Sequence, residues 1–305
     1  MTNLVSLFIL VAVGALLRRV AIPDAHQVRG LGLFVYYAAL PALVAHKMAF
    51  LDLGVAMPWG MIAAYLASMA GAVVLTYLLS LAVRGMASDR RHVLLLAAMA
   101  PNVGYVGLPI VLSAFGDRAV LPGIIIVLIE NVITVGAMTA VLGSHARKDT
   151  HPPSAAQVAK TIATSPLIAA SLIGTAISLS GLPKPALIFG PMELLAQAAI
   201  PVALIVLGAS LPLRWRLADL AFAWPAMVGK LLLQPAVFLL VALLLAVPEF
   251  DRTVGLINVA CPAAINLFLV SNRYQVQQDV VATLVLMTTL GSVATMTALL
   301  WMAGL

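Results

Sequence analysis

Two short stretches of this sequence interrupt apolar runs with proline, glycine and asparagine: Met99-Ala-Pro-Asn-Val-Gly-Tyr-Val-Gly-Leu-Pro109 and Asn258-Val-Ala-Cys-Pro-Ala-Ala-Ile-Asn266. Proline inside a helix removes a backbone hydrogen bond and clashes with the preceding turn, and glycine loosens the same stretch. In lipid, backbone groups freed in this way are tolerated only where they line a cavity inside the protein. The two stretches therefore predict a pair of broken membrane helices that form a binding site.

The composition around these stretches is that of a membrane protein. Of the 305 residues, 63% are hydrophobic and 9% are charged, whereas about a quarter of the residues of a soluble domain are charged. This excludes a water-soluble enzyme, a disordered tail and a fibrous repeat. The single cysteine, Cys261, excludes a disulfide framework and a thiolate metal site. The histidines lack metal-ligand spacing and there is no Gly-rich phosphate loop, so we expect no cofactor beyond a coupling proton or Na⁺.

The apolar runs predict an all-α integral membrane protein with ten transmembrane helices. Strands of a membrane barrel would alternate apolar and polar residues, and runs such as Leu239–Val247 do not. The predicted spans are Asn3–Leu17, Gly30–Ala45, Pro58–Val83, His92–Phe115, Val120–Leu142, Ala163–Ser180, Pro191–Leu211, Leu220–Val247, Val254–Ser271 and Val280–Met302.

Loop charges predict the orientation. Loops after odd-numbered spans carry twelve Lys and Arg residues, and the opposite side carries four. The positive-inside rule then places the odd-numbered loops in the cytoplasm and both termini outside. We expect a multi-pass protein of the bacterial inner membrane with both termini on the periplasmic side. The longest connection, roughly Gly143–Thr161, is predicted to be a solvated linker. We assign residues 143–162 to this cytoplasmic linker between the two halves.

Residues repeat between the halves at an offset of 160 or 161 positions. Gly14 and Gly174 are 160 residues apart, as are Pro41 and Pro201, while Pro101 and Pro262 are 161 apart. Residues 1–142 and 163–305 each hold five predicted spans, and because five is odd, the second half must enter the membrane upside down. An inverted repeat with helices 4 and 9 broken is typical of secondary transporters.

Each break starts a new helix whose free N–H groups and dipole suit an anion. Asn102, Asn258 and Asn266 could add side-chain hydrogen bonds. The alternative is a pair of ordinary proline kinks, with Tyr105 only filling space. The candidate substrate-binding residues are Pro101, Asn102, Gly104, Tyr105, Asn131, Asn258, Pro262 and Asn266.

Three charged residues fall within the predicted spans, where charge is a functional hypothesis by default. Glu130 could carry a coupling proton or make a polar contact between helices. Lys230 could attract the substrate or pair with Glu130 or an asparagine. Glu193, which follows Pro191 at the start of its span, is expected to cap that helix.

The stretch Pro101–Ile110 resembles the fourth-helix signature of the auxin efflux carrier family, which includes plant PIN proteins and bacterial carriers of malonate and related organic acids. Ala199–Leu211 is similar to the seventh helix of that family, and Lys230–Pro235 to its eighth. The resemblance implies the fold shared with the bile/arsenite/riboflavin transporter superfamily. It also implies a homodimeric scaffold of helices 1, 2, 6 and 7, a transport domain of helices 3–5 and 8–10, crossing helices 4 and 9, and an elevator motion. Plant members carry Asn where this chain has Ala100, which argues against auxin as the substrate.

The function predicted from these observations is secondary transport or uniport of small organic anions, carboxylates, at the crossing of helices 4 and 9. Two alternatives stay open: a sodium-coupled symporter of the bile-acid symporter type and a membrane ligand sensor without flux. An intramembrane protease would need catalytic His or paired Asp residues inside the spans. All His and Asp residues lie near predicted helix ends, so we expect no enzyme. The expected partners are the anion, the bilayer and a second copy of the chain, without nucleic acid.

Overall fold

The computed structural model describes residues 2–21, 24–52, 54, 56–145, 154–211 and 217–302. Over these residues the chain forms α-helices with short π-helical and 3-10 segments and no β-strand, which confirms the predicted all-α class. By its contacts the chain divides into two units. Unit 1 comprises Met1–Met57, Gly104–Leu128 and Ala163–Leu211, and unit 2 comprises Pro58–Val103, Ile129–Ile162 and Pro212–Leu305.

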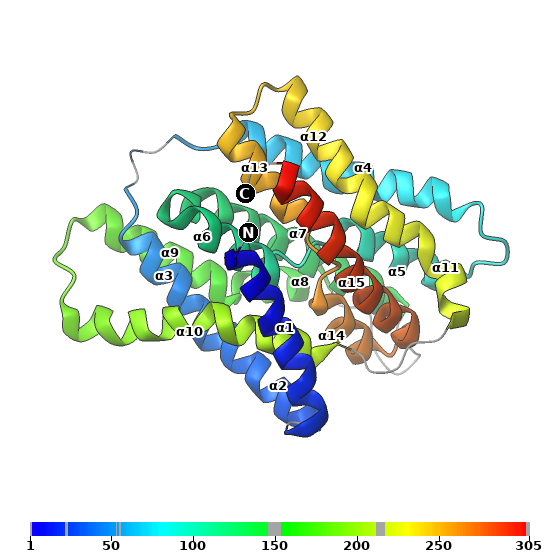
Figure 1. Cartoon of the computed structure of the whole chain (residues 1–305), viewed down its shortest axis with the longest axis horizontal. Helices are drawn as coiled ribbons and strands as arrows, with labels where there is room; N and C mark the ends of the chain where they lie inside the picture. Colours follow the sequence, from blue (N-terminus) through cyan, green and yellow to red (C-terminus); the bar gives the residue numbers. More distant parts are fainter. Residues whose placement is uncertain are drawn as a thin grey trace. The chain divides into compact units, whose positions relative to one another are not determined.

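Unit 1 is built around α10, which packs against α1, α2 and α3, while α9 packs against α3 (Figure 1). Its elements are α1 (Thr2–Val20), α2 (Ala25–Phe34), η1 (Val35–Ala39), α3 (Leu40–Ala49), α6 (Leu108–Phe115), η3 (Gly116–Ala119), α9 (Pro166–Ser180) and α10 (Ala186–Ser210).

Two glycines of unit 1 allow helix backbones to come very close. A Cβ at Gly14 of α1 would collide with the carbonyl oxygen of Ile205 in α10. A Cβ at Gly174 of α9 would lie 2.6 Å from the carbonyl oxygen of Ala45 in α3. The two contacts are related by one offset, because 160 residues separate Gly14 from Gly174 and also Ala45 from Ile205.

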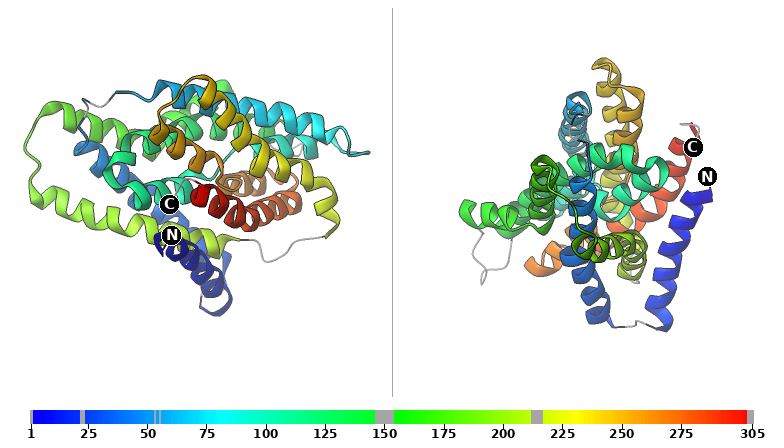
Figure 2. Two further views of the ribbon diagram at one scale, coloured as in Figure 1. Left: turned by 45° about the horizontal axis from the view of Figure 1, so that its top comes forward. Right: turned by 90° about the vertical axis from the view of Figure 1, so that its left-hand side faces the viewer.

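In unit 2, α4 and α12 lie side by side (Figure 1), and α14 packs against α15 (Figure 2). The elements of this unit are α4 (Trp59–Ser80), α5 (Ser88–Met99), α8 (Ala155–Ala163), α11 (Leu217–Val228), η4 (Gly229–Leu233), α12 (Gln234–Leu244), α13 (Glu249–Val259), α14 (Ile265–Tyr274) and α15 (Gln278–Met302). Three elements contribute residues to both units: η2 (Val103–Gly107), α7 (Val120–Ser144) and, through its last residue, α8.

Each of the three π-helical segments ends two residues before a proline. Pro41 follows η1, Pro109 follows η2 and Pro235 follows η4. Proline has no N–H to bond to the carbonyl four residues earlier, and its ring clashes with that carbonyl. In all three cases this carbonyl belongs to the π-helical segment, so the wider turn accommodates the proline without ending the helix.

Within the described residues, six helices are long and apolar enough to cross a membrane, or seven if the bent pair of α8 and α9 is one span. Fewer helices pass this test than the ten predicted because several elements are short. Around the two breaks, α5, α13 and α14 have only 12, 11 and 10 residues, and α9 has 15. The 42-residue stretch Val103–Ser144, which includes α6 and α7, counts once. The ten-span inverted repeat stays a prediction.

The connection between the halves contains a helix that the linker interpretation did not include. At the start of α8, the Ser154 N–H donates to the side chain of Gln157 at 2.7 Å, and the Gln157 N–H donates to Ser154 Oγ at 3.2 Å. This reciprocal capping box is readable in the sequence. Val158 and Ile162 lie one turn apart, and a Cβ at Gly136 of α7 would lie within 4 Å of both. The predicted linker residues Arg147, Lys148 and His151 fall outside the described residues.

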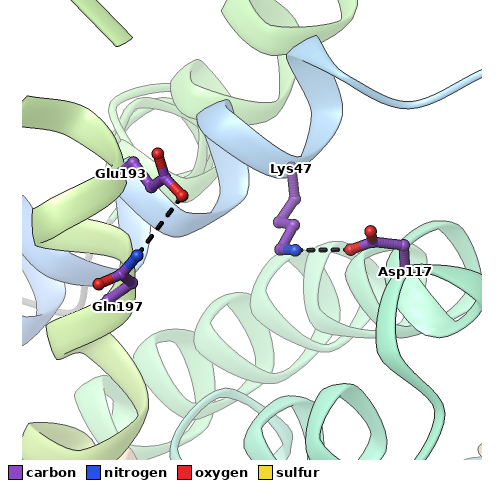
Figure 3. A network of polar contacts seen from close by, with 4 residues as sticks. All are labelled: Lys47, Asp117, Glu193 and Gln197. Atoms are coloured by element: carbon purple, nitrogen blue, oxygen red, sulfur yellow. Dashed lines mark hydrogen bonds and ion pairs between the residues drawn. The ribbon is translucent and has the colours of Figure 1, made fainter. Parts of the chain in front are cut away.

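Figure 3 shows two polar contacts of unit 1. Lys47, in the last turn of α3, makes an ion pair with Asp117 of η3 at 2.5 Å. Glu193 accepts a hydrogen bond from Gln197 at 3.4 Å within α10. The prediction that Glu193 caps its helix is wrong, because α10 begins at Ala186 and places Glu193 beyond the first turn.

Candidate substrate site

The two broken stretches of the sequence lie against each other in unit 2. One break follows α5 and the other separates α13 from α14. The backbone N–H of Asn102 donates to the carbonyl of Pro262 at 2.8 Å, and the N–H of Ala264 donates to the carbonyl of Ala100 at 2.8 Å. These two hydrogen bonds form an isolated antiparallel bridge between Pro101 and Ala263. The prolines that interrupt the helices thus leave extended backbone, and each break satisfies part of the other.

At the second break, α14 begins without a side-chain cap. Its N-cap residue, Ala264, has extended backbone and no side chain that can accept a hydrogen bond. The carbonyl of Ala264 accepts the N–H of Leu267 at 3.1 Å. The N–H groups of the first two residues, Ile265 and Asn266, have no such intrahelical acceptor, and the first turn carries the positive end of the helix dipole. Asn266, the second residue of α14, is half-buried here.

The asparagines at the breaks present different chemistry. Asn102 is 3% exposed, and its side-chain nitrogen is buried without a hydrogen-bond partner. Asn258 is fully buried, donates its side-chain N–H to the carbonyl of Val254 at 2.8 Å, and leaves its side-chain oxygen without a partner. Asn102 therefore has a spare donor, which suits an anion, whereas Asn258 has a spare acceptor, which suits a hydroxyl or a protonated carboxyl.

Gly104 and Tyr105 belong to unit 1, unlike the other predicted site residues. A Cβ at Gly104 would meet nothing within 4 Å. Tyr105 is 8% exposed and interacts electrostatically with Tyr36 of the same unit. That Gly104 and Tyr105 line a site together with the asparagines stays a prediction.

Glu130 and Asn131 lie in α7 on its unit 2 part and are 6% and 7% exposed. Asn131 interacts with a neighbouring group, whereas Oε1 of Glu130 is buried without a hydrogen-bond partner. Tyr65 of α4, which the sequence analysis did not single out, is fully buried, interacts electrostatically with Glu130, and also has an unpartnered hydroxyl. A single tyrosine in an apolar run carries no sequence signal that would have identified it.

Lys230, in η4, is fully buried. It donates hydrogen bonds to the side-chain oxygen of Gln234 and, at 2.9 Å, to the carbonyl of Val259 at the end of α13. The amide of Gln234 donates to the carbonyl of Met99, the last residue of α5, at 3.2 Å. Glu130 is in electrostatic contact with Lys230 but makes no ion pair with it within the described residues.

Gln234 is a second residue of this region that sequence reasoning missed. Its position directly before Pro235, in the stretch that resembles the eighth helix of the family, was the available signal. Cys261 is fully buried and its thiol contacts the carbonyl of Ile257 at 3.4 Å, as a packing residue does. Among the described residues, no three His, Cys, Asp or Glu side chains gather as a metal site would require.

Several long apolar helices, with two breaks paired inside one unit, are typical of a multi-pass membrane transport protein. A family model described as "Membrane transport protein" matches residues 1–302. The chain therefore belongs to this family, that of the auxin efflux carriers, which confirms the resemblance and indicates a transporter rather than an enzyme.

A curated relative is similar to this chain. It is named "Putative malonate transporter", comes from Rhizobium meliloti (strain 1021), and is 34% identical over 209 residues. The match covers 66% of this chain and 63% of the relative, so the chain spans less than two thirds of the relative's length.

Proposed function

We propose that this chain is a secondary transporter or uniporter that moves small organic anions, carboxylates, across a bacterial inner membrane, and that the anion binds where helices 4 and 9 break and cross. The observation that carries the proposal is the pairing of the breaks through Asn102–Pro262 and Ala264–Ala100. Irregular backbone at membrane depth is stable only where it is buried or lines a cavity. The name of the Rhizobium meliloti relative favours malonate and similar dicarboxylates as substrates.

The recognition chemistry follows from the donors that remain available. The uncapped first turn of α14 and the spare side-chain N–H of Asn102 are donors without charge. Such donors bind a carboxylate through hydrogen bonds and the helix dipole. Asn266 would add a donor from the first turn of α14. Asn258 would accept a hydrogen bond from a second, protonated carboxyl or a hydroxyl of the substrate.

The elevator mechanism and the inverted repeat are part of the proposal. The contacts of Gly14 with Ile205 and of Gly174 with Ala45 support the repeat, because one offset relates them. All these residues lie in helices 1, 2, 6 and 7 of the ten predicted membrane helices. We assign these four helices to the scaffold and to the contact with a second copy of the chain. Helices 3–5 and 8–10 would carry the substrate.

The energy source for transport follows from the negative charge of the substrate. The inside-negative membrane potential favours export of an anion by about 2.3 kcal/mol per charge per 100 mV. Uptake would need a coupled cation, and Glu130, with a buried oxygen that lacks a partner, is our candidate for carrying a proton. In the sodium-coupled alternative, Na⁺ would take this role.

Flux measured in proteoliposomes tests the proposal, with a panel of mono- and dicarboxylates and with proton and sodium gradients varied separately. Asn102→Ala and Asn266→Ala should each raise the KM by about tenfold, as expected for a lost hydrogen bond to a charged group. Asn272→Ala is the matched control, since Asn272 lies in the same helix as Asn266 but away from the break.

Two outcomes would contradict the proposal in different ways. Saturable carboxylate binding without flux would identify a ligand sensor instead of a transporter. Normal transport by both Asn102→Ala and Asn266→Ala would show that the anion binds elsewhere.

A further inference from the structure

Lys230 and Gln234, which we call the helix-end clamp, connect the C-terminal ends of both half-helices that lead into the breaks. Lys230 binds the carbonyl of Val259 at the end of α13, and Gln234 binds the carbonyl of Met99 at the end of α5. A hydrogen bond from Lys230 to the oxygen of Gln234 joins the two. Because that bond occupies the amide oxygen, it turns the NH₂ group of Gln234 towards Met99, so one ammonium positions both contacts.

The hydrogen bonds of the last carbonyls of α13 show what the ammonium supplies. The carbonyls of residues 256, 257 and 258 accept from the Ala260 N–H, the Cys261 thiol and the Cys261 N–H. The carbonyl of Val259 would ordinarily accept from the N–H of Ala263, four residues on. That N–H instead donates to Thr288 Oγ1 at 3.1 Å. Lys230 provides the missing donor.

The end of α5 has the same need. The carbonyl of Met99 would ordinarily accept from the N–H of Val103, which instead donates to the carbonyl of Pro101 at 2.9 Å. Gln234 supplies the replacement. Both half-helix ends therefore depend on the clamp because the backbone has turned away from the helix at each break.

Charge and position fit this role. A helix C-terminus carries about half a negative elementary charge, so two such ends together match one ammonium. The Lys230 backbone is held in place, since a Cβ on its neighbour Gly229 would collide with Thr76 of α4. Glu130 and Cys261 are the titratable groups in electrostatic contact with Lys230. In secondary transporters, half-helix C-terminal ends are also where Na⁺ is coordinated.

We propose that the Lys230 ammonium is a resident cation that positions both half-helix ends, so that carboxylate transport by this chain does not require sodium. Lys230 is a positioning residue in this proposal: it acts through the backbone of the breaks and need not touch the substrate. The inference rests on the proposed function for its consequence in transport. The contacts themselves can be tested without flux.

Hydrogen exchange measured on the purified full chain in nanodiscs provides that test. Lys230→Met should speed exchange at residues 100–103 and 260–264 by about tenfold or more in choline medium, because a charge-assisted hydrogen bond is lost. Sodium at equal ionic strength should slow this exchange again in Lys230→Met and leave the wild type unchanged. Gln234→Met should speed exchange at residues 100–103 only, since Lys230 still binds Val259.

Lys184→Met is the matched control, because the Lys184 ammonium lies over the Phe50 ring in unit 1, away from the breaks. Unchanged exchange in Lys230→Met, or an equal effect of Lys184→Met, would overturn the positioning role. If Lys230→Met does not fold, Gln234→Met and Lys230→Arg carry the test: Lys230→Arg keeps the charge and should leave exchange insensitive to sodium.

Flux in proteoliposomes tests the consequence. Wild-type carboxylate flux should be the same in sodium and in choline, and Lys230→Met should become sodium-dependent. Wild-type flux that requires sodium would overturn the resident-cation proposal while supporting a transporter. No wild-type flux in either medium would contradict the proposed function, and the exchange measurements would still decide the role of Lys230.

Discussion

Asp89 and Asp251 stand in the first turns of α5 and α13, the helices that lead into the two breaks, and their surroundings differ. Burial opposes ionisation of Asp89, but hydrogen bonds from the Gln277 amide and the Arg90 N–H, both 2.8 Å long, outweigh it and lower the pKa of the Asp89 carboxyl. For Asp251, burial raises the pKa of the carboxyl above its usual value. The two residues should therefore affect stability with opposite dependence on pH.

Asp89→Asn should destabilise the protein at neutral pH by no more than about 1 kcal/mol, because the carboxylate is only partly buried. Since its folded pKa lies below the unfolded value of about 4, this stability is present above pH 4 and is lost as the pH falls through the folded pKa. Asp251 contributes stability below its unfolded pKa and loses it as the pH rises through the folded pKa, so Asp251→Asn should be neutral or stabilising at pH 7. Thermal unfolding in detergent across this pH range measures both, and destabilisation of the same size by both variants at pH 7 would refute the assignment.

At the scale of elements, the packing of helices in unit 1 depends on glycines, whose lack of a side chain lets two backbones touch. Gly14 and Gly174 stand where helix backbones touch, and Gly208 of α10 faces the carbonyl of Val11 in the same way. Lipid offers no hydrophobic force between helices, so close backbone contact through small residues is a main source of their association. The stability of this unit should therefore be sensitive to substitutions that add a single methyl group at these glycines.

Gly14→Ala and Gly174→Ala should each destabilise the protein by about 1–3 kcal/mol, as overpacking does in a dense interior. Gly30→Ala in α2 is the control within the same unit, because a Cβ there would meet nothing within 4 Å. It should be neutral or stabilise by up to about 1 kcal/mol through higher helix propensity. The midpoint of thermal unfolding in detergent checks all three, and a tolerant Gly14→Ala would show that α1 and α10 can separate without cost.

At the scale of the whole molecule, what could be predicted from the sequence was local. Pro101 and Pro262 break their own helices, so the breaks were predictable from covalent geometry. That the breaks bond to each other, and that Gln234 reaches Met99, depends on residues more than a hundred positions apart. Of the predicted site, Asn102, Pro262 and the start of α14 lie together. The side-chain N–H of Asn258 instead donates to the carbonyl of Val254 in its own helix. These hydrogen-bond partners are determined by tertiary packing, which leaves no local pattern in the sequence.

The predicted orientation is also a property of the whole chain, and it can be tested with labelling at single cysteines. The loop charges place residues 84–91 and 143–162 in the cytoplasm and the loops near Asp52 and Pro183 outside. A membrane-impermeant maleimide added to intact spheroplasts should therefore label Asp52→Cys and Pro183→Cys at once. It should label Ser88→Cys and Ser154→Cys only after the membrane is opened. All four positions are exposed.

Cys261 provides the background control for this experiment. It is the one native cysteine and is fully buried, so the unmodified chain should stay unlabelled in both conditions. Immediate labelling of Ser88→Cys together with protection of Asp52→Cys would invert the orientation. The direction in which the membrane potential drives an anion is set by the membrane itself, so an inverted chain would still favour export. It would instead expose to the cytoplasm the loops here placed outside, including the ion pair of Lys47 with Asp117.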